Sequence, residues 1–282
     1  MTTITGIAAL RARLDTERAA GRTVGFVPTM GYLHAGHASL MTRARAETDV
    51  VIVSIFVNPL QFAAGEDLAA YPHDLAADTA MAQAEGVDVL FVPTEAEMYP
   101  DGVVHTSVRV MQVSAGLEAS TRPTHFDGVA TVVAKLFAIV GTCRAYFGEK
   151  DFQQIAVVRR MVRDLSVPVE VVACPTQRDP DGLALSSRNS YLLDAERAVA
   201  PVLHAALLAG RMAIDAGEVN PAKVRALMAD LISAEPLAHL DYAEVVDAAT
   251  LQTVDPLAGE LRLLAAARFG RARLIDNIGA EV

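Results

Sequence analysis

Two histidines at a short spacing are the residues best suited to phosphate chemistry. The segment from Pro28 to His37 reads PTMGYLHAGH. It follows an apolar run that predicts a buried strand, and it precedes a helical pattern. Such a junction presents backbone N–H groups and the positive end of a helix, and glycines at 31 and 36 let a phosphate approach the backbone closely. The segment therefore predicts an anion site in which the imidazoles of His34 and His37 face one pocket.

A histidine pair leaves other interpretations open. Either ring could be a hydrogen-bonded surface group, and imidazole is also a common metal ligand. No carboxylate or third histidine lies at a helpful local spacing, so the residues favour an anion site and predict no metal site. Cys143 and Cys174 belong to no CxxC or Cys/His cluster, and each lies in an apolar run. They predict two buried thiols in a reducing cytoplasm.

Neutral polar side chains follow the second strand-like run. Asn58 and Gln61 lie in the segment NPLQF, and their amides are suited to orienting hydroxyls or a carboxylate. An Asn-Pro pair alone is also typical of a turn. Farther along the chain, Arg122 precedes a proline in an expected loop. It could contact a substrate, or its neighbours His125 and Asp127 could cap the next helix.

Two later segments carry cationic side chains. In GEKDFQQ, Lys150 is a point charge at an expected strand end and Gln154 lies one turn into the following helix, although Asp151 could simply be an N-cap. The segment is not a Walker A loop, which requires GxxxxGK[ST]. In DGLALSSRN, two hydroxyls precede Arg188, whose guanidinium can bind two phosphate oxygens at once. An ordinary polar loop before a helix has the same composition.

Alternation of short β-rich runs and longer helical patterns predicts the elements that position these residues. Strands are expected at Val24–Pro28, Val50–Val57, Val87–Pro93, Arg144–Phe147 and Val169–Cys174, and helices at His37–Glu47, Asp74–Glu85, Gly128–Gly141 and Asp151–Ser166. This order favours an α/β fold with a doubly wound parallel sheet. Beyond residue 176, a turn-rich segment is followed by helical patterns at Asp194–Ala216 and Pro221–Ala234 and strand-like runs at Leu240–Val246, Glu260–Ala267 and Ala272–Ile278. We therefore expect domains at 1–175 and 176–282, the second a smaller α+β domain.

Composition excludes several classes of protein. The 282 residues are 52% hydrophobic and 21% charged, which is typical of a chain with a large buried core. A formal net charge of −10 argues against a nucleic-acid-binding protein, although a local basic pocket could still hold a small anion. The N-terminus has no basic region followed by a long apolar stretch, and the longest apolar runs are short or broken by Lys135. We expect a soluble protein without a membrane span.

In this order, PTMGYLHAGH, NPLQF, GEKDFQQ and DGLALSSRN resemble the pantoate–β-alanine ligase family. HxGH alone indicates only the wider nucleotidyltransferase superfamily. The resemblance implies that ATP and (R)-pantoate give pantoyl adenylate and pyrophosphate, and that β-alanine then gives pantothenate and AMP. It also implies a Rossmann-like domain with a smaller C-terminal lid domain, Mg²⁺ accompanying ATP, and a homodimer.

The resemblance also implies roles for single residues. His37, His34, Lys150 and Arg188 would be catalytic. The residues assigned to ATP are Met30, Gly31, Tyr32, Leu33, His34, Ala35, Gly36, His37, Gly148, Glu149, Lys150, Asp151, Gln177, Leu185, Ser186, Ser187 and Arg188. Gln61 and Gln154 would hold pantoate with Asn58 nearby, and Arg122 is added to this set from its position in an expected loop.

This sequence departs from the family pattern at three points. Leu185 stands where methionine is common, which is a conservative change. The loop around it contains no lysine, so Arg188 and Lys150 must supply its positive charge. Gln177 stands where a small apolar residue is usual, beside the expected adenine, and the change is harmless if the backbone makes that contact.

Two other functions remain open at this point. One is a different HxGH nucleotidyltransferase that releases a nucleotidylated product and stops. The other is a nucleotide-sensing module without catalytic activity, whose C-terminal domain binds a partner. Formation of AMP that depends on β-alanine separates the ligase from the first, and turnover of ATP separates it from the second.

Overall fold

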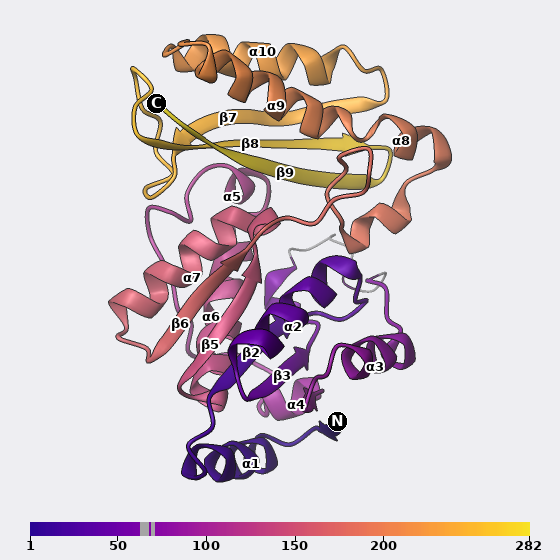
Figure 1. The fold of residues 1–282 in the computed structure, drawn as a ribbon, viewed down its shortest axis with the longest axis vertical. Coiled ribbons are helices and arrows are strands. Elements are labelled where there is room, and N and C mark those ends of the chain that lie inside the picture. The colour runs from indigo at the N-terminus through magenta and orange to yellow at the C-terminus, as the bar shows by residue number, and fades with distance from the viewer. Residues whose placement is uncertain (63–67, 69–70) are drawn as a thin grey trace. The chain divides into compact units, whose positions relative to one another are not determined.

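The chain folds into two compact units, which Figure 1 draws as a ribbon. A computed structural model describes residues 1–62, 68 and 71–282. The N-terminal unit comprises Met1–Gly148 and Gln154–Cys174, and the C-terminal unit comprises Glu149–Gln153 and Pro175–Val282. The expected domains, 1–175 and 176–282, differ from these units mainly at residues 149–153, which group with the C-terminal unit.

A six-stranded parallel sheet forms the centre of the N-terminal unit. Its strands are β1 (Thr2–Ile4), β2 (Val24–Thr29), β3 (Val50–Ile55), β4 (Val89–Phe91), β5 (Cys143–Gly148) and β6 (Val169–Cys174). Their order is β1-β4-β3-β2-β5-β6, and every neighbouring pair is parallel. The predicted α/β fold class is therefore confirmed. The edge strand β1 was not predicted, because three residues of mixed polarity carry no periodic signal.

Helices cover both faces of this sheet. They are α1 (Ile7–Ala19), α2 (Ala35–Glu47), α3 (Leu75–Ala84), α4 (Glu95–Met98), α5 (Glu118–Thr121), α6 (His125–Val140) and α7 (Phe152–Asp164). On β2, Val27 belongs to a buried cluster with Met41 of α2, whereas the neighbouring Phe26 contacts Phe137 of α6. Alternate side chains of a strand point to opposite faces, so both faces of β2 are buried. This explains why the central strands are largely apolar in sequence.

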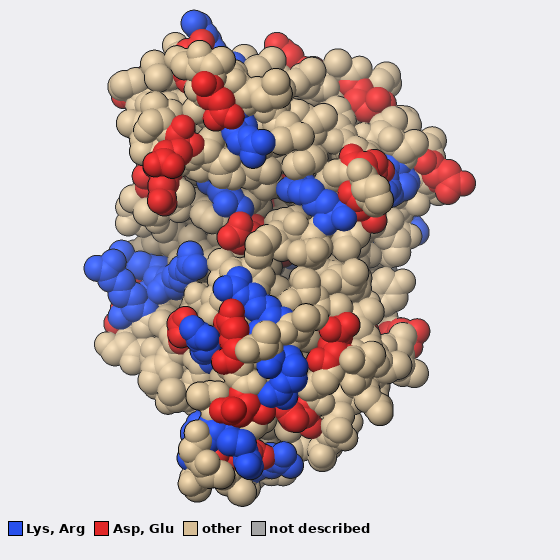
Figure 2. Space-filling model, viewed as in Figure 1, with Lys and Arg blue, Asp and Glu red and all other residues tan. Residues whose placement is uncertain are grey.

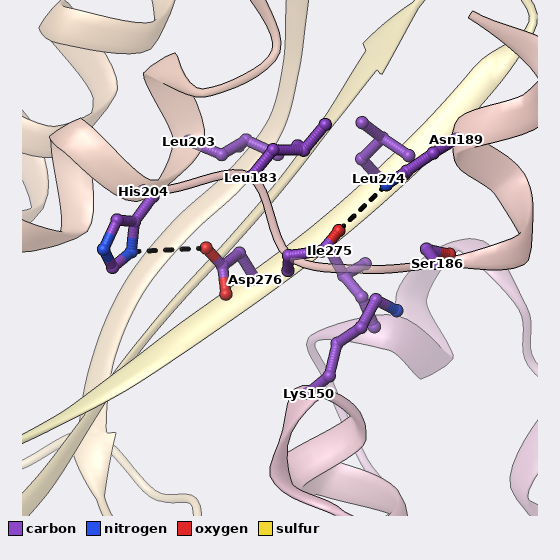
Figure 3. A pocket seen from close by; sticks show the side chains of 10 residues that line it. Lys150, Leu183, Ser186, Asn189, Leu203, His204, Leu274, Ile275 and Asp276 are labelled. Carbon is purple, nitrogen blue, oxygen red and sulfur yellow. Dashed lines mark hydrogen bonds and ion pairs between the residues drawn. The ribbon is translucent and has the colours of Figure 1, made fainter. Parts of the chain in front are cut away.

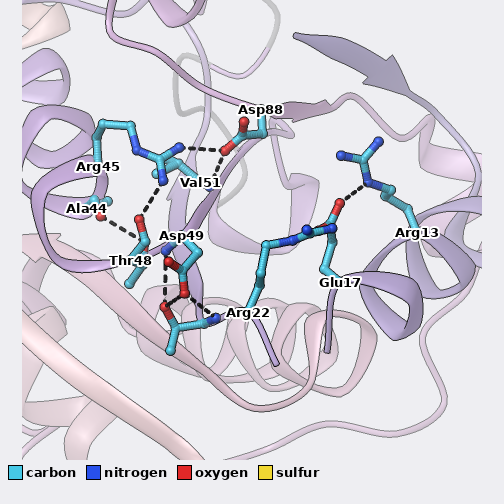
Figure 4. A network of polar contacts seen from close by, with 10 residues as sticks. Arg13, Glu17, Arg22, Ala44, Arg45, Thr48, Asp49, Val51 and Asp88 are labelled. Atoms are coloured by element: carbon cyan, nitrogen blue, oxygen red, sulfur yellow. Dashed lines mark hydrogen bonds and ion pairs between the residues drawn. The ribbon is translucent and has the colours of Figure 1, made fainter. Parts of the chain in front are cut away.

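Polar contacts join the strand beginnings, at the edge of the sheet opposite the carboxyl ends (Figure 4). The carboxylate of Asp49 accepts the backbone N–H of Thr23 at 2.8 Å and its hydroxyl at 2.7 Å. Asp88 accepts the backbone N–H of Val51 at 2.8 Å and pairs with Arg45 at 2.7 Å. These side chains align the starts of β2 and β3. The loops that carry the candidate site follow the carboxyl ends of the strands, at the opposite edge of the sheet.

The C-terminal unit is a three-stranded antiparallel sheet with helices packed on it. The strands are β7 (Ala238–Asp247), β8 (Glu260–Phe269) and β9 (Ala272–Glu281), and the helices are α8 (Asp194–Val199), α9 (Val202–Asp215) and α10 (Pro221–Ser233). The single helical stretch expected at 194–216 is in fact two helices, because Pro201 lies between them and cannot donate a backbone hydrogen bond. A Cβ on Gly210 of α9 would lie 2.8 Å from atoms of Leu263 and Met228, so glycine permits this close packing.

One stretch among the described residues, Asp194–Asp215, is long and apolar enough to pass a test of length and composition for a membrane span, with a mean hydropathy of 1.3. Leu203, Leu207 and Ile214 of this stretch are buried in the core of the C-terminal unit, which accounts for its apolar character. Acidic and basic side chains are interspersed over much of the face that Figure 2 shows, with a gathering of basic side chains beside α7. Cys143 and Cys174 are buried thiols, as predicted.

Candidate functional site

The HxGH segment lies at the point where the strand order of the parallel sheet reverses. The chain proceeds from β2 to β3 and β4 on one side, whereas β5 and β6 lie on the other side of β2. Open α/β sheets bind ligands beyond the carboxyl ends of the strands at such a point. Residues Met30–His34 connect β2 to α2, and Gly148 ends the neighbouring β5.

The two histidines of this segment form the N-terminal cap of α2. His34 is the N-cap residue, and its Nδ1 accepts the backbone N–H of Gly36 at 3.1 Å. The backbone N–H of His34 in turn donates to Nδ1 of His37 at 3.3 Å. The ring centroids lie 4.1 Å apart. Because Nδ1 of each ring acts as an acceptor, a neutral imidazole carries its proton on Nε2. The cap thus sets the tautomer of both rings and makes both Nε2–H groups donors.

A buried carboxylate holds the turn before the histidines. Gly31 and Tyr32 have positive φ angles of 84° and 51°, a conformation that is costly for tyrosine. Asp78 of α3 accepts the backbone N–H of Tyr32 at 2.9 Å and that of Leu33 at 2.6 Å, and it is only 3% exposed. Sequence reasoning missed Asp78, since a single acidic residue within a helix carries no signal of a contact 46 residues away.

We expect Asp78→Asn to destabilise the protein and to impair any activity that depends on the HxGH turn. The new amide group would place a donor against a backbone N–H, which leaves a buried polar group without its partner. The expected loss is about 1–3 kcal/mol in the free energy of unfolding, measured by urea titration. Asp74→Asn is the matched control, because Asp74 caps the same helix in an exposed position and asparagine caps equally well. Equal effects of the two substitutions would contradict this role for Asp78.

An open pocket of about 290 Å³ lies beside the same turn within the N-terminal unit. Met30, Gly31 and Tyr32 line one part of it. The remaining lining includes Phe56 and Val57, which follow β3, together with residues that follow β4 and residues of α3. The predicted ATP-binding residues 30–32 therefore border a pocket at the carboxyl ends of neighbouring strands.

The amide of Asn58 is saturated by contacts within the protein. Its Oδ1 accepts the Tyr99 hydroxyl at 2.8 Å and the backbone N–H of Leu60 at 3.3 Å. Its Nδ2 donates to the carbonyl of Gly128 and to Oε1 of Gln61, both at 3.2 Å. Burial raises the pKa of Tyr99 to about 12, so the hydroxyl stays protonated as a donor. An asparagine amide has two donor and two acceptor positions, and all four are occupied here.

The backbone of Gln61 is held by a second pair of residues. The carbonyl oxygen of Gln61 accepts from Arg122 at 3.1 Å and lies 3.0 Å from Nδ1 of His125. A carbonyl only accepts, so Nδ1 of His125 carries the proton, and Nε2 of His125 accepts from Arg122 at 3.3 Å. Arg122 and His125 thus join the start of α6 to the turn at Gln61. Gln154, the other residue predicted to hold pantoate, lies in the first turn of α7 and is partly buried.

In the C-terminal unit, two of the predicted ATP-binding segments line one narrow pocket. Lys150 follows β5 in a short 3₁₀ turn, Glu149–Asp151, and its ammonium group lies 3.8 Å from the Asp151 carboxylate. Lys150 and Ser186 both line the pocket shown in Figure 3, together with Asn189. The structure therefore brings the GEKD and SSRN segments together within this unit.

The segment before Ser186 is a short hairpin. The backbone N–H of Leu185 donates to the carbonyl of Gln177 at 2.9 Å, and the Asp179–Gly182 turn closes the hairpin. This pairing uses the Gln177 carbonyl, while the Gln177 residue is exposed. Ser186 then caps a 3₁₀ helix by accepting the backbone N–H of Arg188 at 3.3 Å, so Ser187 and Arg188 lie on its first turn.

Several known proteins resemble this chain in sequence. Residues 2–279 match the family model described as pantoate-beta-alanine ligase. The chain belongs to the pantoate–β-alanine ligase family. Among curated members, pantothenate synthetase of Heliobacterium modesticaldum is 55% identical over 93% of each chain. That of Geobacillus kaustophilus is 51% identical, over 98% of this chain and 92% of the relative.

Solved structures of pantoate–β-alanine ligases agree with the fold. The pantothenate synthetase of Thermus thermophilus superposes with a TM-score of 0.93 at 51% identity, covering 99% of both chains. The pantoate-beta-alanine ligase of Francisella tularensis, crystallised with "Beta-gamma ATP and Beta-alanine", gives a TM-score of 0.79 at 34% identity, covering 99% of this chain and 97% of the other. These matches confirm the predicted family and, with it, the predicted ligase activity.

Proposed function

We propose that this ligase acts in two steps through pantoyl adenylate, and that its HxGH cap stabilises the first of them. In that step, a carboxylate oxygen of pantoate bonds to the α-phosphorus of ATP while the bond from that phosphorus to pyrophosphate breaks. In the second, the amine of β-alanine bonds to the acyl carbon, AMP leaves with the carboxylate oxygen, and the nitrogen gives up a proton. The family and the ATP- and β-alanine-bound relative support these substrates.

The observation that carries the proposal is the paired cap of His34 and His37. Attack of a carboxylate on a phosphate brings two anions together, so the transition state needs donors and cations around the phosphates. Both rings present Nε2–H at the positive end of α2, because their Nδ1 atoms accept backbone N–H groups. Each such donor contributes on the order of 2–4 kcal/mol to the transition state. We assign proton donation to the departing pyrophosphate to His37.

We propose that Gln61 and Gln154 bind pantoate and that Asn58 and Arg122 act on Gln61. The Asn58 amide holds the Gln61 side chain and is itself saturated. Arg122 holds the backbone carbonyl of the same residue. A pocket that binds a small hydroxy acid requires rigid donors, since misplacement costs the orientation on which attack depends. Asn58 and Arg122 then serve as positioning residues.

The C-terminal unit contributes cationic and hydroxyl groups to the same nucleotide in this proposal. Lys150 and Arg188 bind phosphate oxygens, with hydroxyls from Ser186 and Ser187. The remaining predicted ATP contacts are Met30–His37, Gly148, Glu149, Asp151, Gln177 and Leu185. Of these, Gln177 is proposed to contribute its backbone, because the hairpin fixes the backbone at this position.

Three further features belong to the proposal. Mg²⁺ enters as part of the ATP substrate, where it neutralises phosphate charge. The ligase is a homodimer, as the family resemblance implies. It acts in the cytoplasm, which is supported by two cysteines that are buried thiols, since a reducing compartment keeps such thiols reduced.

An exchange assay tests the two-step reaction. With ATP, Mg²⁺ and pantoate, we expect labelled pyrophosphate to enter ATP in the absence of β-alanine, since the first step is then reversible. Net AMP release should require β-alanine as well. Exchange that proceeds equally without pantoate would contradict activation of this acid, and AMP release that is independent of β-alanine would favour a different nucleotidyltransferase. ATP binding without any turnover would favour a nucleotide-sensing module.

A further inference from the structure

Two neighbouring polar residues of the last strand are almost completely buried. Asp276 and Asn277 of β9 are 4% and 3% exposed. Successive side chains of a strand point to opposite faces of the sheet. The two residues therefore reach different parts of the C-terminal unit, and neither belongs to a motif that the sequence analysis identified.

The side chain of Asn277 holds the turn that carries Lys150. Its Nδ2 donates to the carbonyl of Glu149 at 3.0 Å and to that of Lys150 at 2.8 Å. Its Oδ1 accepts from Nε of Arg262 at 2.6 Å. Arg262 also pairs with the Glu149 carboxylate at 3.1 Å and lies over the ring of Phe152 at 4.1 Å. The turn at 149–151 is thus tied to β9 through its backbone carbonyls, which leaves the Lys150 side chain to line the pocket.

The side chain of Asp276 holds the hairpin that leads into Ser186–Arg188. Arg178, at the base of that hairpin, donates two hydrogen bonds to the carboxylate, at 2.6 and 2.8 Å. The same guanidinium donates to the carbonyl of Gly182 at 3.0 Å, so it also fixes the hairpin turn. His204 of α9 lies 3.6 Å from Asp276, as Figure 3 shows. Burial alone would raise the pKa of Asp276, but the nearby His204 and the hydrogen bonds from Arg178 outweigh it and hold the pKa below its ordinary value.

We propose that Asp276 and Asn277 form a positioning pair that sets the Lys150 turn and the 177–185 hairpin in one arrangement for binding ATP. Adjacent positions of a rigid strand have a fixed separation, so two segments tied to them cannot move independently. The proposal rests on the proposed function only in assigning Lys150 and Arg188 to ATP. It predicts that changes at this pair weaken nucleotide binding while leaving the pantoate-binding residues of the other unit unaffected.

The substitution Asn277→Asp is the most direct test. Aspartate keeps the shape of the side chain and the oxygen that accepts from Arg262. Its second carboxylate oxygen replaces the donor Nδ2 and faces the carbonyls of Glu149 and Lys150, to which it cannot donate. We expect the Kd of a non-hydrolysable ATP analogue, measured by calorimetry, to rise by at least about tenfold, the effect of one misplaced hydrogen-bonded group. The KM for ATP should rise with it, whereas the KM for pantoate should stay within about twofold of the unchanged protein.

A milder variant and a matched control separate positioning from stability. Arg178→Lys keeps the charge but loses the paired hydrogen bonds to Asp276, and we expect it to weaken analogue binding in the same direction. Glu244→Gln removes another arginine–carboxylate pair of this unit, which joins Glu244 of β7 to Arg225 of α10 at 3.1 Å, and neither of these elements is part of the two ATP segments. It should lower the melting temperature without changing the analogue Kd.

The outcomes distinguish this proposal from the proposed function. If the positioning variants change the melting temperature but leave the analogue Kd and the KM for ATP unchanged, or if the KM values for ATP and pantoate rise equally, the positioning role is wrong. If the unchanged protein binds the analogue but shows no pantoate-dependent exchange, the proposed function fails while the positioning role is still tested by the binding measurement.

Discussion

Replacing His37 with asparagine is expected to lower the rate of pantoate-dependent pyrophosphate exchange by about 10²-fold or more, the effect of removing one donor from a charged transition state. Asparagine places its amide oxygen near the position of Nδ1, where it can accept the backbone N–H of His34 and keep the helix cap. It has no group at the position of Nε2. The loss should therefore appear in kcat with little change in melting temperature.

His37→Gln is the complementary variant. Its amide reaches the position of Nε2 and restores a donor, but it does not reproduce the Nδ1 acceptor. We expect it to recover part of the rate and to melt at a lower temperature than the asparagine variant. If both variants retain near-normal exchange, the Nε2–H of His37 has no part in the first step.

Replacing Lys150 with methionine is the second change for which we expect a large loss, about 10²-fold in kcat/KM for ATP. Methionine approximates the length of the lysine side chain and removes its charge from a position that is 18% exposed. A cation held near transferring phosphates acts where water is partly excluded, so its removal costs more than that of a surface charge. The measurement is the steady-state rate of AMP release at varied ATP.

Lys223→Met is the matched control for Lys150. It removes one positive charge from the same unit, but Lys223 is 69% exposed and pairs with Glu218 at the surface. We expect no more than a change of about twofold for this variant, in line with the small contribution of exposed ion pairs. A similar loss in the two variants would show that net charge matters and that the location of Lys150 does not.

The sequence predicted the central sheet well because its strands are buried on both faces. The nearly continuous apolar run of β3 (Val50–Ile55), in which every residue but the last is buried, is distinctive. Elements with weaker patterns were missed or misjudged. The helix α1 spans Ile7–Ala19 with alternating charges and alanines and was not predicted, and Pro201 divides a helix that periodicity alone joined.

The motif residues of the candidate site were also predictable, because their order along the chain is specific to one family. The residues that hold them were not. Asp78 and Asn277 contact the motifs across long stretches of chain, and Asp276 contacts Arg178 at the base of the hairpin that leads into one of them. Nothing in their local sequence indicates those contacts. Asn58 was assigned to substrate from its type, but only the structure shows that its amide is saturated. Long-range partners of this kind follow from the fold and not from a pattern.

The most direct measurement of the central claim is a crystal structure of the protein with a non-hydrolysable ATP analogue and Mg²⁺. We expect Nε2 of His34 and His37 at hydrogen-bond distance, about 2.7–3.2 Å, from phosphate oxygens, while each Nδ1 still accepts a backbone N–H of the α2 cap. Nucleotide bound with its phosphates beyond reach of both rings, or rings rotated so that Nδ1 faces the phosphates, would contradict it.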